Sequence, residues 1–362
     1  GTVTLQCALQ GVGVVPGDEV IVPGMTWCAT AQAAMDIGAT VVFVDIDPET
    51  LAIDPASVEK AITRRTKAII PVHLYGCMCD MDALLKIAKK HKLKIVEDVA
   101  HQHGSRWRNK GAGAIGDAGS FSFQQSKVLT CGEGGAVTTN DLDVYKTVFA
   151  LKQVGWVPAD PKKSLYDNVV PAKRYGHNYR LNEMQAVLLR GGLMRLEKQT
   201  VLREARAKQL REGLAEIGGP LRAAYRDPRI TRQAYYAMTF YYDPKKAGGV
   251  NKHAFAHAVG AEGCGFGGPY WPVYRTPLLN LYDSTSPIPF RDRKKMQDYK
   301  HMKLPNTERC VEETALLLGH PHLLGSEQYI NQLLAAMRKV TDNLPAAQKA
   351  WEKFQKQHRQ KH

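Results

Sequence analysis

The sequence of 362 residues contains no apolar run long enough to cross a lipid bilayer, which excludes an ordinary helical membrane protein. It has no internal repeat and no low-complexity tract, which excludes a solenoid. No secretory leader is visible, although the chain begins at Gly1 rather than at a methionine. The hydrophobic share of 44% and the charged share of 23% are ordinary for a globular protein. We therefore expect a globular protein in the cytoplasm, without a membrane partner.

Cysteine is sparse, and its number is odd. Seven cysteines are scattered along the chain, which argues against a disulfide framework and for a reducing cytosol. Cys77 and Cys79 are too close together for a usual zinc-binding pair, and no second pair accompanies them. We expect free thiols and no metal site.

Acidic residues are fewer than basic ones, so the net charge is +14 and the pI is near 9.4. Such an excess can indicate nucleic-acid binding, but the basic residues are spread out and no helix-turn-helix or RNA-binding signature occurs. The clearest basic cluster is the tail at 349–362, which we interpret as a solvated terminal helix. A positive field that attracts anionic small molecules is the alternative. We expect no nucleic-acid partner, and a nucleic-acid-binding or regulatory protein is the competing class.

Strand and helix patterns alternate through the first two thirds of the chain. The predicted strands are 19–22, 41–44, 68–71, 93–97, 119–123 and 135–139. The predicted helices are 4–9, 30–37, 55–62 and 81–91. Asp54 and Asp80 precede two of these helices as N-caps. The alternation predicts an α/β fold with a largely parallel sheet that is covered by helices on both faces.

The last part of the chain has a different pattern. A helical stretch at 181–217 ends in a Gly-Gly-Pro turn, and a strand is predicted at 234–242. A loop rich in glycine and aromatic residues follows at 263–272, and a helix capped by Ser326 is predicted at 327–340. We interpret this part as a smaller α+β domain. The predicted division is a large cofactor-binding domain at 1–200 and a small C-terminal domain at 201–362.

Two residues suggest the chemistry. Asp98 ends an apolar run, and Lys127 follows a Phe/Ser run and precedes a Gly-Glu-Gly-Gly turn. Ligands bind outside the carboxyl ends of strands in such sheets, which is where Asp98 is expected. A lysine can form an imine with an aldehyde cofactor, and an aspartate can keep the pyridine nitrogen of that cofactor protonated. The pair therefore predicts a pyridoxal phosphate site.

Three further residues suit such a site. Trp27 follows a strand and can stack on the cofactor ring, whereas a core tryptophan is the simpler interpretation of it alone. Gly1 and Thr2 precede a helix, so their backbone N–H groups can meet a phosphate. Ser122 can add a hydroxyl. Each signal is weak alone, since a single lysine is usually a surface residue, and only their order and spacing favour a site.

The chain resembles the DegT/DnrJ/EryC1/StrS sugar aminotransferases, which have the fold-type-I aminotransferase fold. The matching segments include GDEVIVPGMTWCAT (17–30), VEDVAHQHG (96–104), GDAGSFSFQQSKVLTCGEGGAVTTND (116–141) and YGHNYRLNEMQA (175–186). They span most of the predicted large domain, while the C-terminal third matches only loosely. Members of the family normally carry several dozen residues before the Gly-Thr pair.

The resemblance implies a role for each matching residue. Lys127 matches the lysine that binds the cofactor covalently, Asp98 the partner of the pyridine nitrogen, and Trp27 the residue stacked on the ring. Thr2 and Ser122 match phosphate ligands. Asn178 matches an asparagine that reaches the phosphate of the partner subunit. The resemblance therefore implies a homodimer with composite active sites.

One departure from the family pattern concerns His101. Many members have glutamine at this position, facing the phenolic oxygen of the cofactor, and histidine can still donate a hydrogen bond there. Together with the run Gln124 to Thr130, this feature resembles the subgroup that aminates cyclitols.

The resemblance thus implies transfer of an amino group from an amino acid, expected to be L-glutamine, to a keto-cyclitol such as scyllo-inosose. The alternatives are a nucleotide-linked keto-sugar as acceptor, or an enzyme like 3-amino-5-hydroxybenzoate synthase. A dehydratase on the same fold is disfavoured, because relatives of that kind have histidine in place of Lys127. His73, Tyr75, Gln124 and the Tyr270-Trp271 loop are candidates for binding substrate hydroxyls, although His73 can equally be a core histidine.

Overall fold

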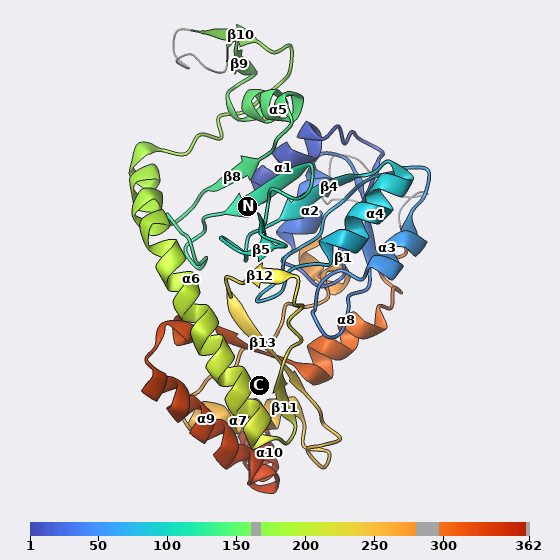
Figure 1. Ribbon diagram of the computed structural model, residues 1–362. Coiled ribbons are helices and arrows are strands. Elements are labelled where there is room, and N and C mark those ends of the chain that lie inside the picture. The colour runs from blue at the N-terminus through green and yellow to red at the C-terminus, as the bar shows by residue number, and fades with distance from the viewer. Residues whose placement is uncertain (161–167, 280–296, 360–362) are drawn as a thin grey trace.

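The structure is a computed structural model that describes residues 1–160, 168–279 and 297–359 (Figure 1). At its centre is a six-stranded sheet with the order β2-β1-β3-β4-β7-β8. These strands are β1 (Glu19–Pro23), β2 (Thr40–Val44), β3 (Thr66–Ile69), β4 (Lys94–Asp98), β7 (Ala118–Ser122) and β8 (Gly135–Thr138). All run parallel except β8, which is antiparallel to β7. The predicted α/β fold with a mostly parallel mixed sheet is therefore confirmed.

Helices cover both faces of this sheet, which explains the continuous apolar runs of its strands. One group consists of α1 (Thr2–Gly11), α2 (Ala29–Asp36) and α5 (Leu142–Lys152). The other group consists of α3 (Pro55–Ala61) and α4 (Met81–His91). Alternate residues of β1 enter different cores: Val20 and Val22 join the core of the first group, and Ile21 joins that of the second.

The helix ends follow local sequence signals. Asp54 and Asp80 accept hydrogen bonds from the first backbone amides of α3 and α4, and Ser326 does the same for α9 (Glu327–Thr341). These N-caps were predicted. Helix α6 (Glu183–Ile217) begins with a capping box between Asn182 and Gln185, so it starts slightly later than predicted.

A second, antiparallel sheet has the order β11-β13-β14. Its strands are β11 (Leu221–Ala223), β13 (Ala237–Tyr242) and β14 (Ala315–Gly319). Residues of this sheet form an apolar core with residues of α6, α7 (Lys252–Ala261), α9 and α10 (Leu344–Arg359). Strand β13 starts later than predicted, and Tyr235 just before it has a left-handed φ of 53°. The predicted terminal helix is present as α10, and Trp351 packs it against this core.

The remaining described elements are short. Strands β12 (Ile230–Arg232), β5 (Arg106–Trp107) and β6 (Lys110–Gly111) form one small sheet, and β10 (Val169–Pro171) and β9 (Trp156–Pro158) form another. The short helices are η1 (Val273–Arg275), η2 (Pro277–Leu279), α8 (Pro305–Arg309), η3 (Cys310–Thr314) and η4 (His320–Leu324).

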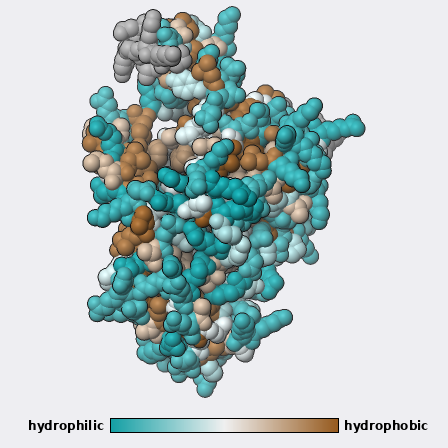
Figure 2. Space-filling view, viewed as in Figure 1, coloured by the Kyte–Doolittle hydropathy of each residue, from teal (hydrophilic) through white to brown (hydrophobic). Residues whose placement is uncertain are grey.

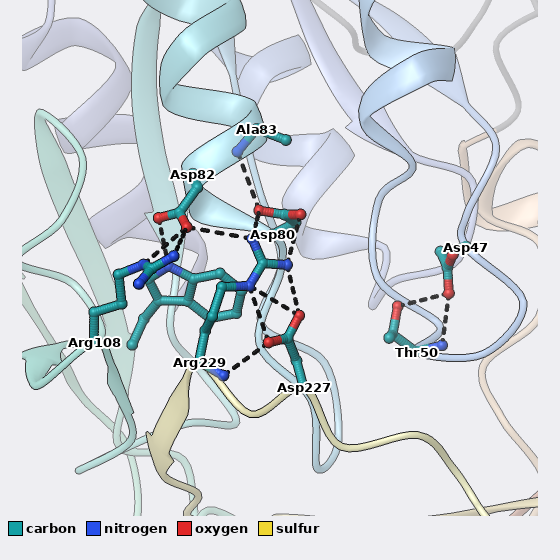
Figure 3. A network of polar contacts seen from close by, with 9 residues as sticks. Asp47, Thr50, Asp80, Asp82, Ala83, Arg108, Asp227 and Arg229 are labelled. Atoms are coloured by element: carbon teal, nitrogen blue, oxygen red, sulfur yellow. Dashed lines mark hydrogen bonds and ion pairs between the residues drawn. The ribbon is translucent and has the colours of Figure 1, made fainter.

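A network of ion pairs connects the β12 region to the start of α4 (Figure 3). Arg229 contacts the carboxylates of Asp80, Asp82 and Asp227, and Arg108 contacts Asp82 as well. The network anchors the beginning of the segment that leads from β12 into β13.

The predicted division at residues 200 and 201 stays a prediction. Thr200 lies inside α6, which continues across that boundary. Ala315 and Leu317 of β14 belong to the core of the large sheet. The separate core around β13 supports a second unit, but contacts of this kind join it closely to the first.

Three further observations bear on the class of protein. All seven cysteines are free thiols. Within the described ranges, no helix combines the length and apolar character that crossing a bilayer requires. The same part of the chain contains no group of three or more His, Cys, Asp or Glu side chains placed to hold a metal ion.

Candidate active site

A cavity of about 460 Å³ lies at the carboxyl ends of β4 and β7, next to the start of α1. Six of the predicted site residues line it: Thr2, Trp27, Asp98, His101, Ser122 and Lys127. They meet because β4 and β7 are paired in parallel, so that both strands end at the same edge of the sheet. A larger cavity of about 740 Å³, beside β8 and α5, is lined by none of the predicted residues.

The carboxylate of Asp98 is buried and held on both oxygens. Its Oδ2 accepts a hydrogen bond of 2.9 Å from the hydroxyl of Thr30, and Thr30 is in turn 2.8 Å from the hydroxyl of Thr26. Its Oδ1 accepts from the backbone N–H of Ala100 at 3.1 Å. These contacts fix the direction of the carboxylate at the cavity wall. The sequence offered no signal for the two threonines.

Lys127 lies in the turn after β7, where its backbone N–H donates to the carbonyl of Gln124. Its Nζ is 4.8 Å from the centre of the Tyr236 ring. Burial in the cavity lowers the pKa of Lys127, and the nearby charge of Asp98 opposes this shift in part. A lowered pKa increases the fraction of neutral amine, which is the form that attacks an aldehyde.

The start of α1 and the end of β7 together make an anion-binding corner. Helix α1 begins at Thr2, and the Ser122 hydroxyl lies beside Gly1. A Cβ atom added to Gly1 would come within 3.1 Å of the Ser122 side chain, so the two segments approach closely. Free N–H groups at a helix start and an adjacent hydroxyl suit a phosphate.

His101 presents a hydrogen-bond donor to the cavity. Its Nδ1 accepts from the backbone N–H of Tyr75 at 3.2 Å, and its Nε2 is 3.4 Å from the hydroxyl of Tyr270. Burial keeps the pKa of His101 well below its usual value, and the positive charge of Lys127 acts in the same direction. The imidazole is therefore neutral, and because Nδ1 accepts, its proton is on Nε2. The predicted role of this donor, facing the phenolic oxygen of the cofactor, stays a prediction.

Aromatic rings form one wall of the cavity. Trp27 is 56% exposed at its mouth, and its ring centre is 5.4 Å from that of Tyr270. Tyr236, which lies just before β13, stacks on His101 with ring centres 3.8 Å apart. Tyr270 was predicted from the sequence, whereas Tyr236 was not, because a tyrosine at a strand end has no distinctive local pattern.

Some of the residues predicted to contact the substrate line the cavity, and others do not. Gln124 and Tyr270 line the cavity, whereas the fully buried His73 does not and instead bonds to Glu97 at 3.0 Å. His73 is therefore a core histidine, and the suggestion that it binds substrate is wrong. Tyr75 is buried behind the wall, where its hydroxyl accepts from the backbone N–H of Tyr270, and Trp271 is largely exposed.

Of the residues predicted to bind the cofactor, Asn178 is the one that does not line the cavity. It lies beyond α5, where its backbone pairs with Gln153. Within the described residues, it is not among those that border the cavity at the start of α1.

The residues present fit pyridoxal phosphate. Lys127 supplies an amine, Asp98 a fixed carboxylate, the α1 start with Ser122 a phosphate corner, and Trp27 an aromatic face. Each of these groups borders the same cavity.

Solved structures with the same fold point to one class of enzyme. The crystal structure of 3-amino-5-hydroxybenzoic acid synthase has a TM-score of 0.79 and 32% sequence identity, covering 94% of this chain and 85% of its own. The aminotransferase from Psychrobacter cryohalolentis has a TM-score of 0.81 and 31% identity, covering 95% and 86%. These likenesses and the fold define the class: an aminotransferase that uses pyridoxal phosphate.

The family is equally clear. The profile of the DegT/DnrJ/EryC1/StrS aminotransferase family matches residues 1–335, and the chain belongs to this family. An L-glutamine:2-deoxy-scyllo-inosose aminotransferase of Micromonospora echinospora is 37% identical over 347 residues, which are 95% of this chain and 81% of the relative. An L-glutamine:scyllo-inosose aminotransferase of Streptomyces griseus is 37% identical over 355 residues, with 95% and 81% covered.

Proposed function

We propose that this aminotransferase moves an amino group from L-glutamine to a keto-cyclitol such as scyllo-inosose. The observation that carries the proposal is the similarity, over nearly the whole chain, to relatives named for this donor and for scyllo-inosose or its 2-deoxy form.

We propose that Lys127 would bind the cofactor covalently and, once released, would take a proton from the substrate carbon as base and give it back as acid. When bound, pyridoxal phosphate supplies the electron sink for loss of that proton. Asp98 would keep the pyridine nitrogen protonated, while Thr2 and Ser122 would hold the phosphate. Trp27 would cover the ring, and the Nε2 of His101 would donate to the phenolic oxygen. The burial of Asp98 and the lowered pKa of Lys127 support these roles.

The charge of the cavity supports a neutral polyol as acceptor. Apart from Lys127, none of the described residues that line it is a lysine or an arginine. A nucleotide-linked sugar has a diphosphate, which proteins usually bind with arginine or lysine. The polar side chains of Gln124, Tyr236 and Tyr270 can instead pair with ring hydroxyls.

The visible absorption of the bound cofactor tests this function. L-glutamine alone should bleach the visible absorption band of the cofactor in the purified enzyme. Scyllo-inosose, added next, should restore this band. Bleaching by L-glutamate but not L-glutamine would move the acceptor to the nucleotide-linked keto-sugars. Restoration only by the keto precursor of 3-amino-5-hydroxybenzoate would favour that alternative.

We further propose a homodimer in which Asn178 of each chain reaches the phosphate corner of the partner. Apolar side chains are exposed along the first half of α6, close in sequence to Asn178, and Figure 2 shows apolar surface gathered there. They include Met184, Val187, Leu188, Leu193 and Met194. A contiguous exposed apolar face of this kind is typical of a protein interface.

Subunit mixing tests the composite site. Lys127→Ala and Asn178→Ala would each be inactive alone. Equal mixing of the two variants after dissociation should restore about a quarter of the wild-type activity, since half of the dimers are mixed and one site in each is intact. No recovery, although mixed dimers form, would mean that Asn178 does not act across subunits.

We also propose that the enzyme is cytoplasmic, because its seven cysteines are free.

A further inference from the structure

Tyr236 contacts several residues around the Lys127 amine, but no role has yet been assigned to it. Its ring stacks on His101 at an angle of 10°, and the Nζ of Lys127 lies 4.8 Å from its centre. Its hydroxyl is 3.2 Å from the hydroxyl of Ser126 and also bonds to the side chain of Tyr270. One side chain thus links the amine, the imidazole and the aromatic wall.

The backbone around Tyr236 is held in place by several independent contacts. Its N–H donates to the carbonyl of Tyr75, and its carbonyl accepts from His320, both at 3.0 Å. The preceding residue, Tyr235, has a left-handed φ of 53°, a conformation that is costly for a residue with a side chain. Strain of this kind persists only where the surroundings enforce it, and it gathers at functional sites.

Two neighbours complete this support. The buried guanidinium of Arg203 donates to the carbonyl of Ala234 at 2.8 Å. A Cβ atom at Gly76 would come within 2.6 Å of the carbonyl oxygen of Ala237, so only glycine allows the approach. The position of Tyr236 is therefore built into the fold.

We propose that Tyr236 is a positioning residue for Lys127: its ring stabilises the ammonium form of the released amine and keeps that amine beside the cofactor. The inference rests on the proposed function, in which Lys127 must accept a proton and return it. Burial favours the neutral amine, whereas the face of an aromatic ring attracts the cation. The two effects oppose each other, so the amine can hold either proton state during the cycle. The stacked His101 is fixed by the same ring.

Three variants separate the ring from its hydroxyl and from general packing. Tyr236→Leu removes the aromatic face but keeps apolar volume, and Tyr236→Phe removes only the hydroxyl. Tyr241→Leu is the matched control, because Tyr241 lies on the adjoining strand β13 and its ring faces Arg222, with the Cζ atom 4.3 Å from its centre. The measurement is the rate at which the full cofactor-free chain captures pyridoxal phosphate, followed by visible absorption as a function of pH.

Capture needs the neutral amine, so its rate rises with pH through the pKa of Lys127. Loss of the ring should move this rise to lower pH by about 0.5 to 1.5 units in Tyr236→Leu. Tyr236→Phe keeps the aromatic face, and Tyr241→Leu changes a ring that does not line the cavity, so both should leave the pH of this rise unchanged. The ionisation of pyridoxal phosphate itself is common to all variants and therefore does not affect the comparison. An unmoved or upward-shifted rise in Tyr236→Leu, or an equal shift in Tyr241→Leu, would overturn the inference.

Failure of the proposed function has a different signature. If the wild-type chain captures no pyridoxal phosphate, or Lys127→Ala captures it with the same spectrum, the role of Lys127 is wrong. If wild type captures it and the Tyr236 variants behave identically, only the inference about Tyr236 is wrong.

Discussion

Neighbouring carboxylates at the end of β4 lie in two different regions of the molecule. Asp98 borders the cavity that also contains Lys127. The side chain of Glu97 is fully buried on the opposite face of β4. It accepts hydrogen bonds from the Nε2 of His73 and from the backbone N–H groups of Gly113, Ile115 and Gly116. Because side chains alternate along a strand, one step in the sequence moves an acid from a cavity into a sealed polar cage.

The difference shows how surroundings assign a role to a charged residue. Four protein donors serve Glu97, and the Nδ1 of His73 accepts the backbone N–H of Cys79, so this cage is complete without a ligand. Asp98 is fixed by Thr30 and Ala100 but remains at a cavity wall. We therefore expect changes in the cavity to alter chemistry and changes in the cage to alter stability.

The largest effect is expected in the cavity, from Lys127→Ala. Without the amine, the proton transfer has no base, and turnover should fall by at least about 10³-fold. Lys152→Ala is the control, because this lysine is also partly buried and lies over an aromatic ring, that of Phe149. Steady-state rates would measure both variants, and equal losses would contradict a special role for Lys127.

Asp98→Asn should weaken the enzyme next most strongly. It keeps the shape of the side chain but removes the charge that we propose holds the pyridine nitrogen protonated. Leaving one half of such a buried ion pair without its partner costs about 3 kcal/mol. Titration with pyridoxal phosphate would report the lost affinity, and thermal unfolding of the cofactor-free protein should change little. Normal cofactor content and turnover would contradict the assignment.

Glu97→Gln should show the opposite pattern. The amide would direct its own N–H group at a backbone donor in the cage, so the free energy of unfolding should fall by about 3 kcal/mol. Urea unfolding would measure this, with the exposed Glu59→Gln as control. The folded Glu97→Gln variant should still bind pyridoxal phosphate with a normal absorption spectrum. Loss of that spectrum would contradict the expectation that Glu97 affects stability and Asp98 affects cofactor binding.

The same cage predicts a dependence of stability on pH. Burial alone would raise the pKa of Glu97, but hydrogen bonds from His73 and from backbone N–H groups outweigh it and hold the pKa below the ordinary value of 4.5. The stabilisation is therefore complete above pH 4.5 and is lost as the pH falls through the lowered pKa. Glu97→Gln should flatten this acid limb in unfolding experiments.

The smallest effect is expected in the surface network of Figure 3. Hydrogen bonds from Arg108, and also from Trp107, lower the pKa of Asp82 to about 2. The pair is exposed to solvent, so Asp82→Asn should cost no more than about 1 kcal/mol of stability. A loss as large as that of Glu97→Gln would show that the network, rather than the cage, holds the fold together.

Local signals in the sequence were sufficient to predict the large sheet and to select Lys127 and Asp98 as candidate site residues. Apolar runs ending in Asp98, and caps such as Asp54 and Asp80, act over a few residues and can be recognised one at a time. Lys127 and Asp98 were likewise found from their place after strands.

The rest depends on contacts between distant segments. Tyr236 meets Lys127 only because the second sheet folds against the first, and Thr30 bonds to Asp98 although 68 positions separate them in the sequence. His73 was ambiguous for the same reason, since only its contact with Glu97 places it in the core. Asn178 stays a prediction, because its role lies with a second chain.

The most direct test of the central claim is reduction of the loaded enzyme with sodium borohydride, which makes the bond between lysine and cofactor permanent, followed by peptide mass mapping. The pyridoxyl group should be found on Lys127, within the peptide between β7 and β8. A label on another lysine, or none in a protein that retains the cofactor, would contradict it.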